Sequence, residues 1–369
     1  MKKTPGKLIL LIVMTGLASF FVSCKQMNST AKEEEGQFRY DGPMQTLAFE
    51  IERTKDPATG KVPWDQLRVA IETANATRKQ LRLLDNFTEA LNWSERGPIS
   101  DVPGPSNGNT RANGGIPSGR VRALMVDSLD ATHKTVFVGS VAGGLWKTTD
   151  ITASPANWII VDDRMNNLAI ADICQDPRPG FQNNMYLCTG ESYGNIDAVR
   201  GVGVFKSVDG GTTWNFLSST SSYINGTRIL CDYLGNVYLG TRSSGLLRST
   251  DGGNSWTGIT PTGIGSDVCD LEISSTAVAG RLHITTGIFS TSGYRYTDNP
   301  ETATTSSGWN AATTAFTTFN QRTELAVSGN TLFALPDNSS HLVPTIWKST
   351  DGGANWASTT SQPTSGWAN

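Results

Sequence analysis

One short pattern recurs along the chain and limits the folds that it can adopt more than any other feature does. Three stretches share the form Ser-x-Asp-x-Gly-x-x-Trp: VFKSVDGGTTWNFL (204–217), LLRSTDGGNSWTGI (246–259) and IWKSTDGGANWAST (346–359). Weaker copies at 145–158 and 294–309 keep only part of the pattern, namely Thr148, Asp150, Trp158, Asp298 and Trp309. The aspartates recur at intervals of about 50 residues, and a period of this length indicates a repeat architecture.

Two short runs of strand-forming residues precede each copy of the pattern. Each run is rich in β-branched or aromatic residues and is bounded by Gly, Asp, Asn or Pro, which is typical of strands. A third strand leads into the pattern and a fourth begins at its Trp, so each repeat supplies four antiparallel strands, as in one blade of a β-propeller. We therefore predict an all-β fold, a β-propeller of four-stranded blades over 93–369. Five blades are expected, at 120–165, 166–220, 226–262, 266–315 and 321–361.

The repeated pattern itself is explained as the turn between the third and fourth strands. Its Ser and Asp side chains can bond backbone amides of their own turn, its glycines supply positive φ, and its Trp buries a large ring. A phosphate-binding loop would continue into Gly-Lys-Ser/Thr and a helix, and a calcium loop would need more acidic ligands. The residues given this structural role are Ser207, Asp209, Gly211, Trp214, Ser249, Asp251, Gly253, Trp256, Ser349, Asp351, Gly353 and Trp356.

The pattern resembles the Asp-box, or BNR repeat, of sialidases, sortilin-like receptors, xyloglucanase-type glycoside hydrolases and photosystem II assembly factors. The stretches VFVGSVAGGLWKTTD (136–150) and MYLCTGESYGNIDAVRGVGVFKSVDGGTTW (185–214) resemble the sortilin and xyloglucanase branch more than the sialidases. The resemblance covers roughly 93–369. It implies a β-propeller, a fold that hosts many functions, so it does not by itself imply an activity.

The N-terminus resembles a bacterial lipoprotein signal peptide. Three lysines precede the apolar stretch Leu8–Val22, which is too short for an ordinary transmembrane helix but suits a signal peptide over 1–23. The resemblance implies that Cys24 carries a lipid; a plain secretory signal with a chance cysteine is the alternative. Residues 24–42 are polar and are predicted to be a flexible tether. We expect an exported protein at the bacterial outer membrane or cell surface, held to the membrane only by its lipid, or else secreted.

Two helices are expected within 43–92, since apolar residues there recur at helical spacing. Trp93 could open an outer strand that closes the last blade. The repeat at 321–361 already has a fourth strand of its own, so a further blade would lack its first three strands. We therefore expect that the natural protein continues beyond Asn369, with a complete five-bladed propeller as the alternative.

Charge and cysteine content bear on partners and cofactors. The chain has 30 Lys and Arg against 33 Asp and Glu, and removal of the signal peptide would make it more acidic, which disfavours nucleic acid as a partner. No Cys-x-x-Cys pair suggests a zinc site, and neither a metal nor a cofactor is expected. The cysteines after Cys24 are open to three disulfide pairings in an exported chain, or to burial as free thiols. They are Cys174, Cys188, Cys231 and Cys269.

Ligands of propellers generally bind on the face that carries the loops between second and third strands. The longest charged loop of this kind, 190–203, holds Glu191, Tyr193, Asp197 and Arg200. Arginines also stand at the starts of three first strands and could ring the mouth of the channel, where their planar forks suit a carboxylate or phosphate. These are Arg120, Arg228 and Arg322. The alternative is that the loop charges are solvated and that the arginines pair with neighbours such as Asp172, Asp232 and Asp270.

The sequence does not supply a recognisable catalytic set. A sialidase-like site would need an Arg-Ile-Pro motif, which is missing, and a xyloglucanase-like site would need two carboxylates, of which one position here holds Val141. No Gly-x-Ser-x-Gly elbow accompanies the three histidines. We therefore expect a non-catalytic module that binds a glycan or an envelope or extracellular protein. The alternatives are a glycoside hydrolase, with carboxylates on the ligand face or in a missing C-terminal part, and an assembly scaffold.

Overall fold

The computed structural model describes residues 43–84, 120–193, 198–275, 277, 279–288, 290–318, 321–338, 340, 342–359 and 367–368. The predicted signal peptide (1–23), the lipidation site Cys24, the tether (24–42), Trp93 and Asp197 therefore lie outside the described residues. The chain divides into two compact units, one ending at Trp64 and the other beginning at Asp65. Each unit is described by itself below.

The first unit contains α2 (Pro43–Thr54), and α3 (Trp64–Leu84) begins at the boundary of the second. In α2 and the turn after it, Lys55 pairs with Glu52 and the Asp56 carboxylate accepts a hydrogen bond from the backbone N–H of Ala58. In α3, Arg68 and Glu72 form an ion pair one helical turn apart. Among the described residues, neither helix combines the length and the apolar composition needed to cross a bilayer.

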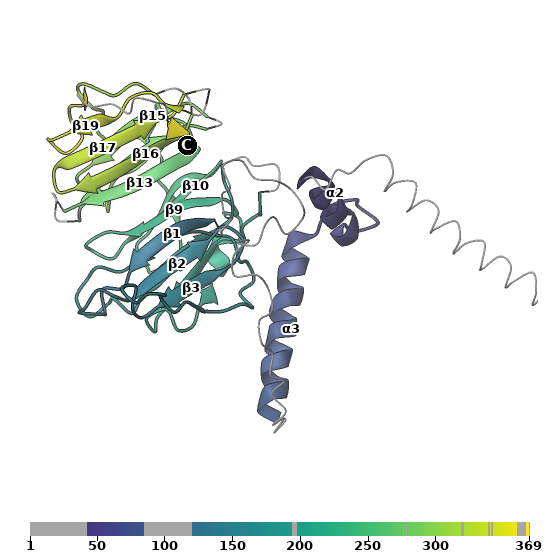
Figure 1. The fold of residues 1–369 in the computed structure, drawn as a ribbon. Helices are drawn as coiled ribbons and strands as arrows, with labels where there is room; N and C mark the ends of the chain where they lie inside the picture. Colours follow the sequence, from purple (N-terminus) through teal and green to yellow (C-terminus); the bar gives the residue numbers. More distant parts are fainter. Residues whose placement is uncertain are drawn as a thin grey trace, which may run out of the picture. The chain divides into compact units, whose positions relative to one another are not determined.

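The second unit consists mainly of antiparallel sheets that follow one another in chain order (Figure 1). Four of them have four strands each, and in every one the strand order follows the order of the sequence. They are β1 (Val121–Val126), β2 (Val136–Ser140), β3 (Leu145–Thr148) and β4 (Ile159–Ile160); β5 (Ile170–Gln175), β6 (Met185–Thr189), β7 (Val204–Ser207) and β8 (Asn215–Phe216); β9 (Gly226–Cys231), β10 (Val237–Thr241), β11 (Gly245–Ser249) and β12 (Thr257–Gly258); and β16 (Thr323–Ser328), β17 (Thr331–Pro336), β19 (Trp347–Ser349) and β20 (Ala357–Ser358).

The remaining sheet of comparable size has three strands, β13 (Val268–Ser274), β14 (Arg281–Thr286) and β15 (Gly293–Thr297). A single bridge between Tyr296 and Asn310 stands where the other blades have their fourth strand. Two small elements complete the described strands and turns: the 3-10 helix η2 (Ser218–Thr220), and a pair formed by β18 (Leu342–Val343) and β21 (Trp367–Ala368). The weak copy of the pattern at 294–309 thus coincides with the least regular blade.

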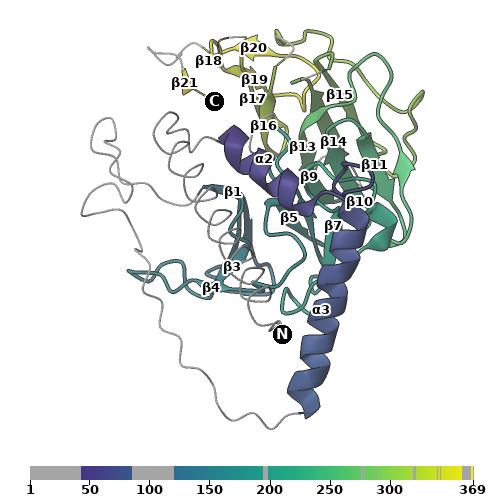
Figure 2. The ribbon, with the colours of Figure 1, turned by 90° about the vertical axis from the view of Figure 1, so that its right-hand side faces the viewer.

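The first strands of successive sheets pack against each other in the order β1, β5, β9, β13, β16, and in Figure 2 they follow an arc. Each pair of neighbouring sheets encloses its own hydrophobic cluster, because alternate strand residues point to opposite faces. Phe137 and Ile170 lie between the first two blades, Ile229 and Leu239 between the next two, and Tyr294 and Leu332 between the last two. The predicted β-propeller of four-stranded blades, with a short helical N-terminal region, is confirmed.

The Ser-x-Asp-x-Gly-x-x-Trp stretches form the turns after β7, β11 and β19. In the first of them the Ser207 hydroxyl donates to Asp209 Oδ1 (2.7 Å) and accepts from the backbone N–H of Gly211 (2.9 Å). Trp214 Nε1 donates to the carbonyl of Gly211 (3.2 Å). Gly211 has φ +80°, and a Cβ there would lie 2.6 Å from Phe137 Cζ of the preceding blade, so both the backbone and the packing require glycine.

Candidate functional site

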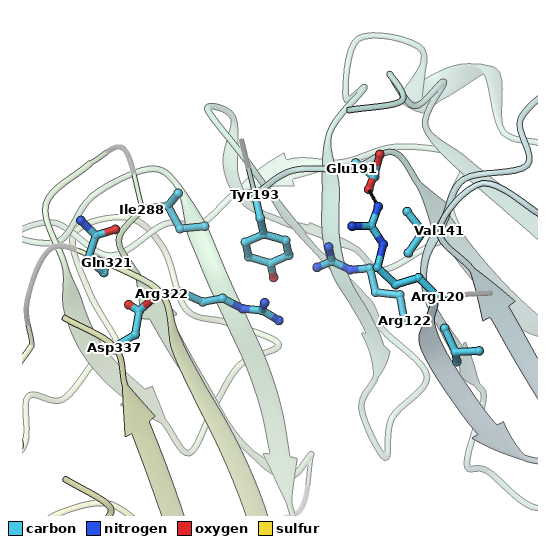
Figure 3. A pocket seen from close by; sticks show the side chains of 10 residues that line it. Arg120, Arg122, Val141, Glu191, Tyr193, Ile288, Gln321, Arg322 and Asp337 are labelled. Atoms are coloured by element: carbon cyan, nitrogen blue, oxygen red, sulfur yellow. Dashed lines mark hydrogen bonds and ion pairs between the residues drawn. The ribbon is translucent and has the colours of Figure 1, made fainter. Parts of the chain in front are cut away.

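A pocket of about 480 Å³ opens where β1, β16 and the loop after β6 come together (Figure 3). Its walls are formed by residues at the starts of first strands and by residues that follow second strands, which matches the face on which ligands were expected. Ten residues line it: Arg120, Val121, Arg122, Val141, Glu191, Tyr193, Ile288, Gln321, Arg322 and Asp337.

Tyr193 stands at the centre of this pocket, and two arginines from different blades lie over its ring. The guanidinium carbon of Arg122 is 3.9 Å from the ring centroid and that of Arg322 is 4.0 Å from it. The Tyr193 hydroxyl donates to the backbone carbonyl of Cys269 (2.9 Å), which fixes the ring. Burial raises the pKa of Tyr193, so its hydroxyl stays protonated and neutral. The ring therefore attracts both cations through its π face and holds them in the pocket.

The three arginines of the pocket differ in how their charge is neutralised. Arg120 pairs with Glu191 (2.5 Å), whose other oxygen accepts the backbone N–H of Val199 (3.0 Å). Arg322 pairs with Glu324. Arg122, by contrast, has no ion pair or hydrogen bond from its guanidinium to any of the residues that the structure describes. Its guanidinium lines the pocket beside the ring of Tyr193 (Figure 3).

Arg228 does not line the pocket but lies among carboxylates of the first strands. It contacts Asp270 (2.5 Å), Glu272 (3.1 Å) and Asp172 (3.6 Å). Burial alone would lower the pKa of Arg228, but Asp172, Asp270 and the neighbouring carboxylates raise it well above the ordinary value, so the side chain is charged. The pairing of the strand-start arginines with neighbouring acids, which the sequence left open, is found for all three: Arg228 pairs with aspartates, and Arg120 and Arg322 pair with glutamates. Arg120, Arg122 and Arg322 are the arginines that meet at the pocket.

One oxygen of each of the two buried aspartates also accepts a hydrogen bond from the next first strand. Asp172 Oδ2 accepts the backbone N–H of Ile229 (2.9 Å), and Asp270 Oδ2 accepts that of Leu325 (2.7 Å). Burial raises the pKa of both acids. We call the set of Arg228, Asp172, Asp270, Glu272 and Glu324 the inner charge network. It links β5, β9, β13 and β16, and its position makes it part of the structure that supports the pocket.

Arg200, another candidate from the sequence, does not line the pocket. Its carbonyl accepts a hydrogen bond from Asn167 (2.7 Å), and burial lowers the pKa of its guanidinium. Two tryptophans of third strands also lie outside the pocket lining. Trp146 donates from Nε1 to the carbonyl of Gly143 (2.8 Å), and Trp347 packs against the cluster between the last two blades.

Sequence reasoning missed Arg122, although a signal was present. Arg120 and Arg122 are two positions apart at the start of a strand, and residues at that spacing in a regular strand lie on the same face. Gln321 and Asp337 were missed as well, because they follow from the pairing of β16 with β17, in which Thr323 lies opposite Pro336. Asp337 is only 3% exposed.

The pocket offers positive charge and polar groups rather than an evident catalytic pair. Two carboxylates line it, Glu191 and Asp337, but Glu191 is already bonded by Arg120 and a backbone amide. Val141, where the resemblance to xyloglucanases would place an acid, presents an apolar side chain that is 7% exposed. In the described residues, no group of three or more His, Cys, Asp or Glu side chains is arranged to hold a metal ion. The geometry can therefore bind an anion.

Comparison with known proteins yields structural likenesses only. No protein-family model matches the sequence, and no curated protein matches it. An ancestral GH74 enzyme is similar at 22% identity and a TM-score of 0.45, over 62% of this chain and 30% of that one. The GH74 xyloglucanase from Xanthomonas campestris is similar at 13% identity and a TM-score of 0.41, over 65% of this chain and 45% of that one. YCF48 bound to D1 peptide is similar at 14% identity and a TM-score of 0.41, over 66% of this chain and 67% of that one. The match thus spans less than half the length of either enzyme, and the comparisons assign no activity to this chain.

Proposed function

We propose that this chain is a non-catalytic binding module and that its pocket holds the carboxylate of an acidic glycan, such as a uronic acid residue. One observation carries the proposal: Arg122 lies in a pocket of about 480 Å³ without a carboxylate partner among the described residues. A guanidinium presents two parallel N–H donors that match a carboxylate, and such charge-assisted pairs are the strong ones. An incoming carboxylate would give Arg122 the direct ion pair that it does not form with any described residue.

The rest of the pocket suits a sugar ring that carries such a group. Its volume lies within the roughly 300–1,000 Å³ of small-molecule sites. Gln321 supplies an amide and Asp337 a carboxylate for hydroxyl groups, and Ile288 and Val141 supply apolar surface for ring carbons. In this proposal the protein is exported and presents the pocket at the cell surface from a lipid on Cys24, as the N-terminal sequence indicates.

A glycoside hydrolase remains the second candidate, because Glu191 and Asp337 line one pocket from different blades. A hydrolase needs one carboxyl group as an acid and another as a base or nucleophile. Arg120 donates to one carboxylate oxygen of Glu191 and the backbone N–H of Val199 to the other, so neither oxygen is left to face a leaving group, which speaks against its use as the acid. This candidate predicts the release of new reducing ends from a bound glycan.

Calorimetric titration with acidic and neutral oligosaccharides tests the proposal. We expect the full chain to bind oligogalacturonate and not the galacto-oligosaccharide of equal length, with an affinity that falls as salt is added. Arg122→Ala should weaken binding by about tenfold to a hundredfold, which is the usual range for a lost charge-assisted hydrogen bond. Arg164→Ala, a half-exposed arginine outside the pocket, is the matched control and should bind as the wild type does.

The outcomes of the titration test the ligand selectivity, the site, the absence of hydrolysis and the ligand class separately. Equal binding of the neutral sugar would show that the arginines do not select the ligand, and an unchanged affinity in Arg122→Ala would remove the proposed site. The appearance of reducing ends in the wild type would make the chain a hydrolase. If the acidic sugar is not bound at all, the ligand class is wrong.

A further inference from the structure

Two cysteines from different blades point at each other where β5 packs against β9. The Sγ atoms of Cys174 and Cys231 are 3.6 Å apart, which is a direct contact between sulfurs. Both are free thiols. Since β5 and β9 belong to different sheets, this is a contact between blades and not between paired strands of one sheet.

The approach of the two sulfurs follows from the register of the two strands. Asp172 and Cys174 are two residues apart on β5, and Ile229 and Cys231 are two residues apart on β9, so each pair shares a face of its strand. The bond from the backbone N–H of Ile229 to Asp172 Oδ2 (2.9 Å) fixes the strands at one point. Cys174 and Cys231 lie two residues further along their strands, on the same faces, and their sulfurs therefore meet as well.

We propose that Cys174 and Cys231 are the site of a disulfide that joins the second blade to the third when the chain meets a thiol oxidant. The other two cysteines that the structure describes are placed differently. Cys188 and Cys269 are fully buried, and the Cys269 sulfur lies 3.9 Å from the backbone carbonyl of Gln321. Among the described residues, Cys174 and Cys231 are therefore the pair selected by geometry out of the several pairings that the sequence allows.

The reaction is an ordinary thiol–disulfide exchange with a small disulfide such as oxidised glutathione. Cys174 is the more exposed of the pair, so its thiol loses a proton to solvent and its sulfur attacks one sulfur of the oxidant. The bond between the two glutathione sulfurs breaks and one glutathione leaves as thiol. The Cys231 sulfur, losing its own proton, then attacks the Cys174 sulfur and displaces the second glutathione. Two protein thiols are oxidised and one oxidised glutathione is reduced to two thiols.

Burial controls the rate of this step. It raises the pKa of the Cys174 thiol well above its ordinary value, so the reactive thiolate is scarce at neutral pH. The reaction should therefore accelerate as the pH is raised. The product closes a long loop, because the two cysteines are 57 residues apart in the sequence, and cross-links of long loops generally stabilise the folded state.

Peptide mapping of the full chain tests the site. Native protein is incubated with oxidised glutathione at mildly alkaline pH, the remaining thiols are alkylated in denaturant, and the digest is analysed by mass spectrometry. We expect the peptides that carry Cys174 and Cys231 to be joined, with Cys188 and Cys269 alkylated. The melting temperature should rise by roughly 5–10 °C on oxidation and return on reduction.

Two variants make the result specific. Cys188→Ala should still form the link, whereas Cys231→Ala should form none and should show no rise in melting temperature on oxidation; if Cys231→Ala does not fold, Cys174→Ala serves in its place. A link between Cys174 and Cys188 would overturn the assignment. So would a Cys174 that stops at the mixed disulfide with glutathione, or recovery of both cysteines fully alkylated, because either result means that the sulfurs cannot reach each other.

Discussion

At the scale of single residues, Tyr193 is the group on which the pocket depends, although it bears no charge. Its ring lies under both Arg122 and Arg322, and it keeps two like charges close together that would otherwise repel each other. Without the ring, Arg322 still has Glu324 as a partner, and Arg122 has no ion-pair partner among the described residues. The position of Arg122 should therefore be lost first.

We predict that Tyr193→Leu weakens binding of the acidic oligosaccharide by about tenfold, the equivalent of one or two cation–π contacts. Tyr193→Phe is the matched control, because it keeps the ring and removes only the hydrogen bond to Cys269, and it should bind within about threefold of the wild type. Calorimetric titration of the three proteins measures this, with circular dichroism to verify folding. Equal affinities for Tyr193→Leu and Tyr193→Phe would mean that the ring does not position the arginines.

At the scale of elements, the Ser-x-Asp-x-Gly-x-x-Trp turns depend on their ionised aspartates. Asp251 accepts bonds from the backbone N–H of Ser255 (2.9 Å), the Ser255 hydroxyl (2.6 Å) and the Ser249 hydroxyl (2.8 Å). The bonds from Ser255 lower the pKa of Asp251 to about 2, and those of Asp209 and Asp351 are lowered to about 2 by equivalent bonds. These hydrogen bonds favour the charged form of the carboxylate.

A lowered pKa in the folded state means that each aspartate stabilises the fold above its ordinary pKa of 3.8 and that this contribution is lost as the pH falls toward 2. We predict that Asp251→Ala lowers the melting temperature at pH 7 by roughly 2–4 °C and has a smaller effect at pH 2. Thermal unfolding followed by tryptophan fluorescence at the two pH values provides the measurement. Asp163→Ala, an exposed acid outside the turns, serves as the control, and an Asp251→Ala effect that does not change with pH would contradict the explanation.

The blades and the arginines of the pocket show what the sequence could predict and what it could not. Repeats and strand periodicity are local, so the blades, the turns and the positions of Glu191, Tyr193 and Arg120 relative to the strands could be expected. The carboxylate that pairs with an arginine, by contrast, can lie far from it in the sequence. Arg228 contacts Asp270, which is 42 residues away, and Arg120 contacts Glu191, which is 71 residues away. The spacing in the sequence could have placed Arg122 beside Arg120, but only the packing of one first strand on the next determines which guanidinium forms no ion pair.

At the scale of the whole propeller, the inner charge network connects four first strands. It contains more carboxylates than arginines. Four carboxylates surround Arg228 and Arg322, and two of them, Asp172 and Asp270, are deeply buried. Each buried acid also bonds a backbone amide of the next strand. The network therefore supports the arc of strands on which the pocket lies, but full ionisation places like charges near one another at a cost in stability.

Glu272 is the member whose titration should reveal this cost. Burial raises its pKa to about 7, with Asp172 and Glu324 acting in the same direction and Arg228 opposing them. The ordinary value is 4.5, so between about pH 4.5 and pH 7 the folded state binds more protons than the unfolded state. The free energy of unfolding should therefore decrease as the pH rises through this window, and the loss should be complete above pH 7.

We predict that Glu272→Gln removes this loss, because the amide can still accept the hydrogen bond from Arg228 but cannot ionise. Relative to the wild type, the variant should be more stable at pH 8 by an amount on the order of 1 kcal/mol, and nearly equal at pH 5. Urea unfolding at both pH values measures the difference, with Glu52→Gln, an exposed glutamate in the first unit, as the control. A variant that is less stable than the wild type at pH 8 would show instead that Arg228 requires the ionised Glu272, and the network would then be balanced in charge rather than overloaded.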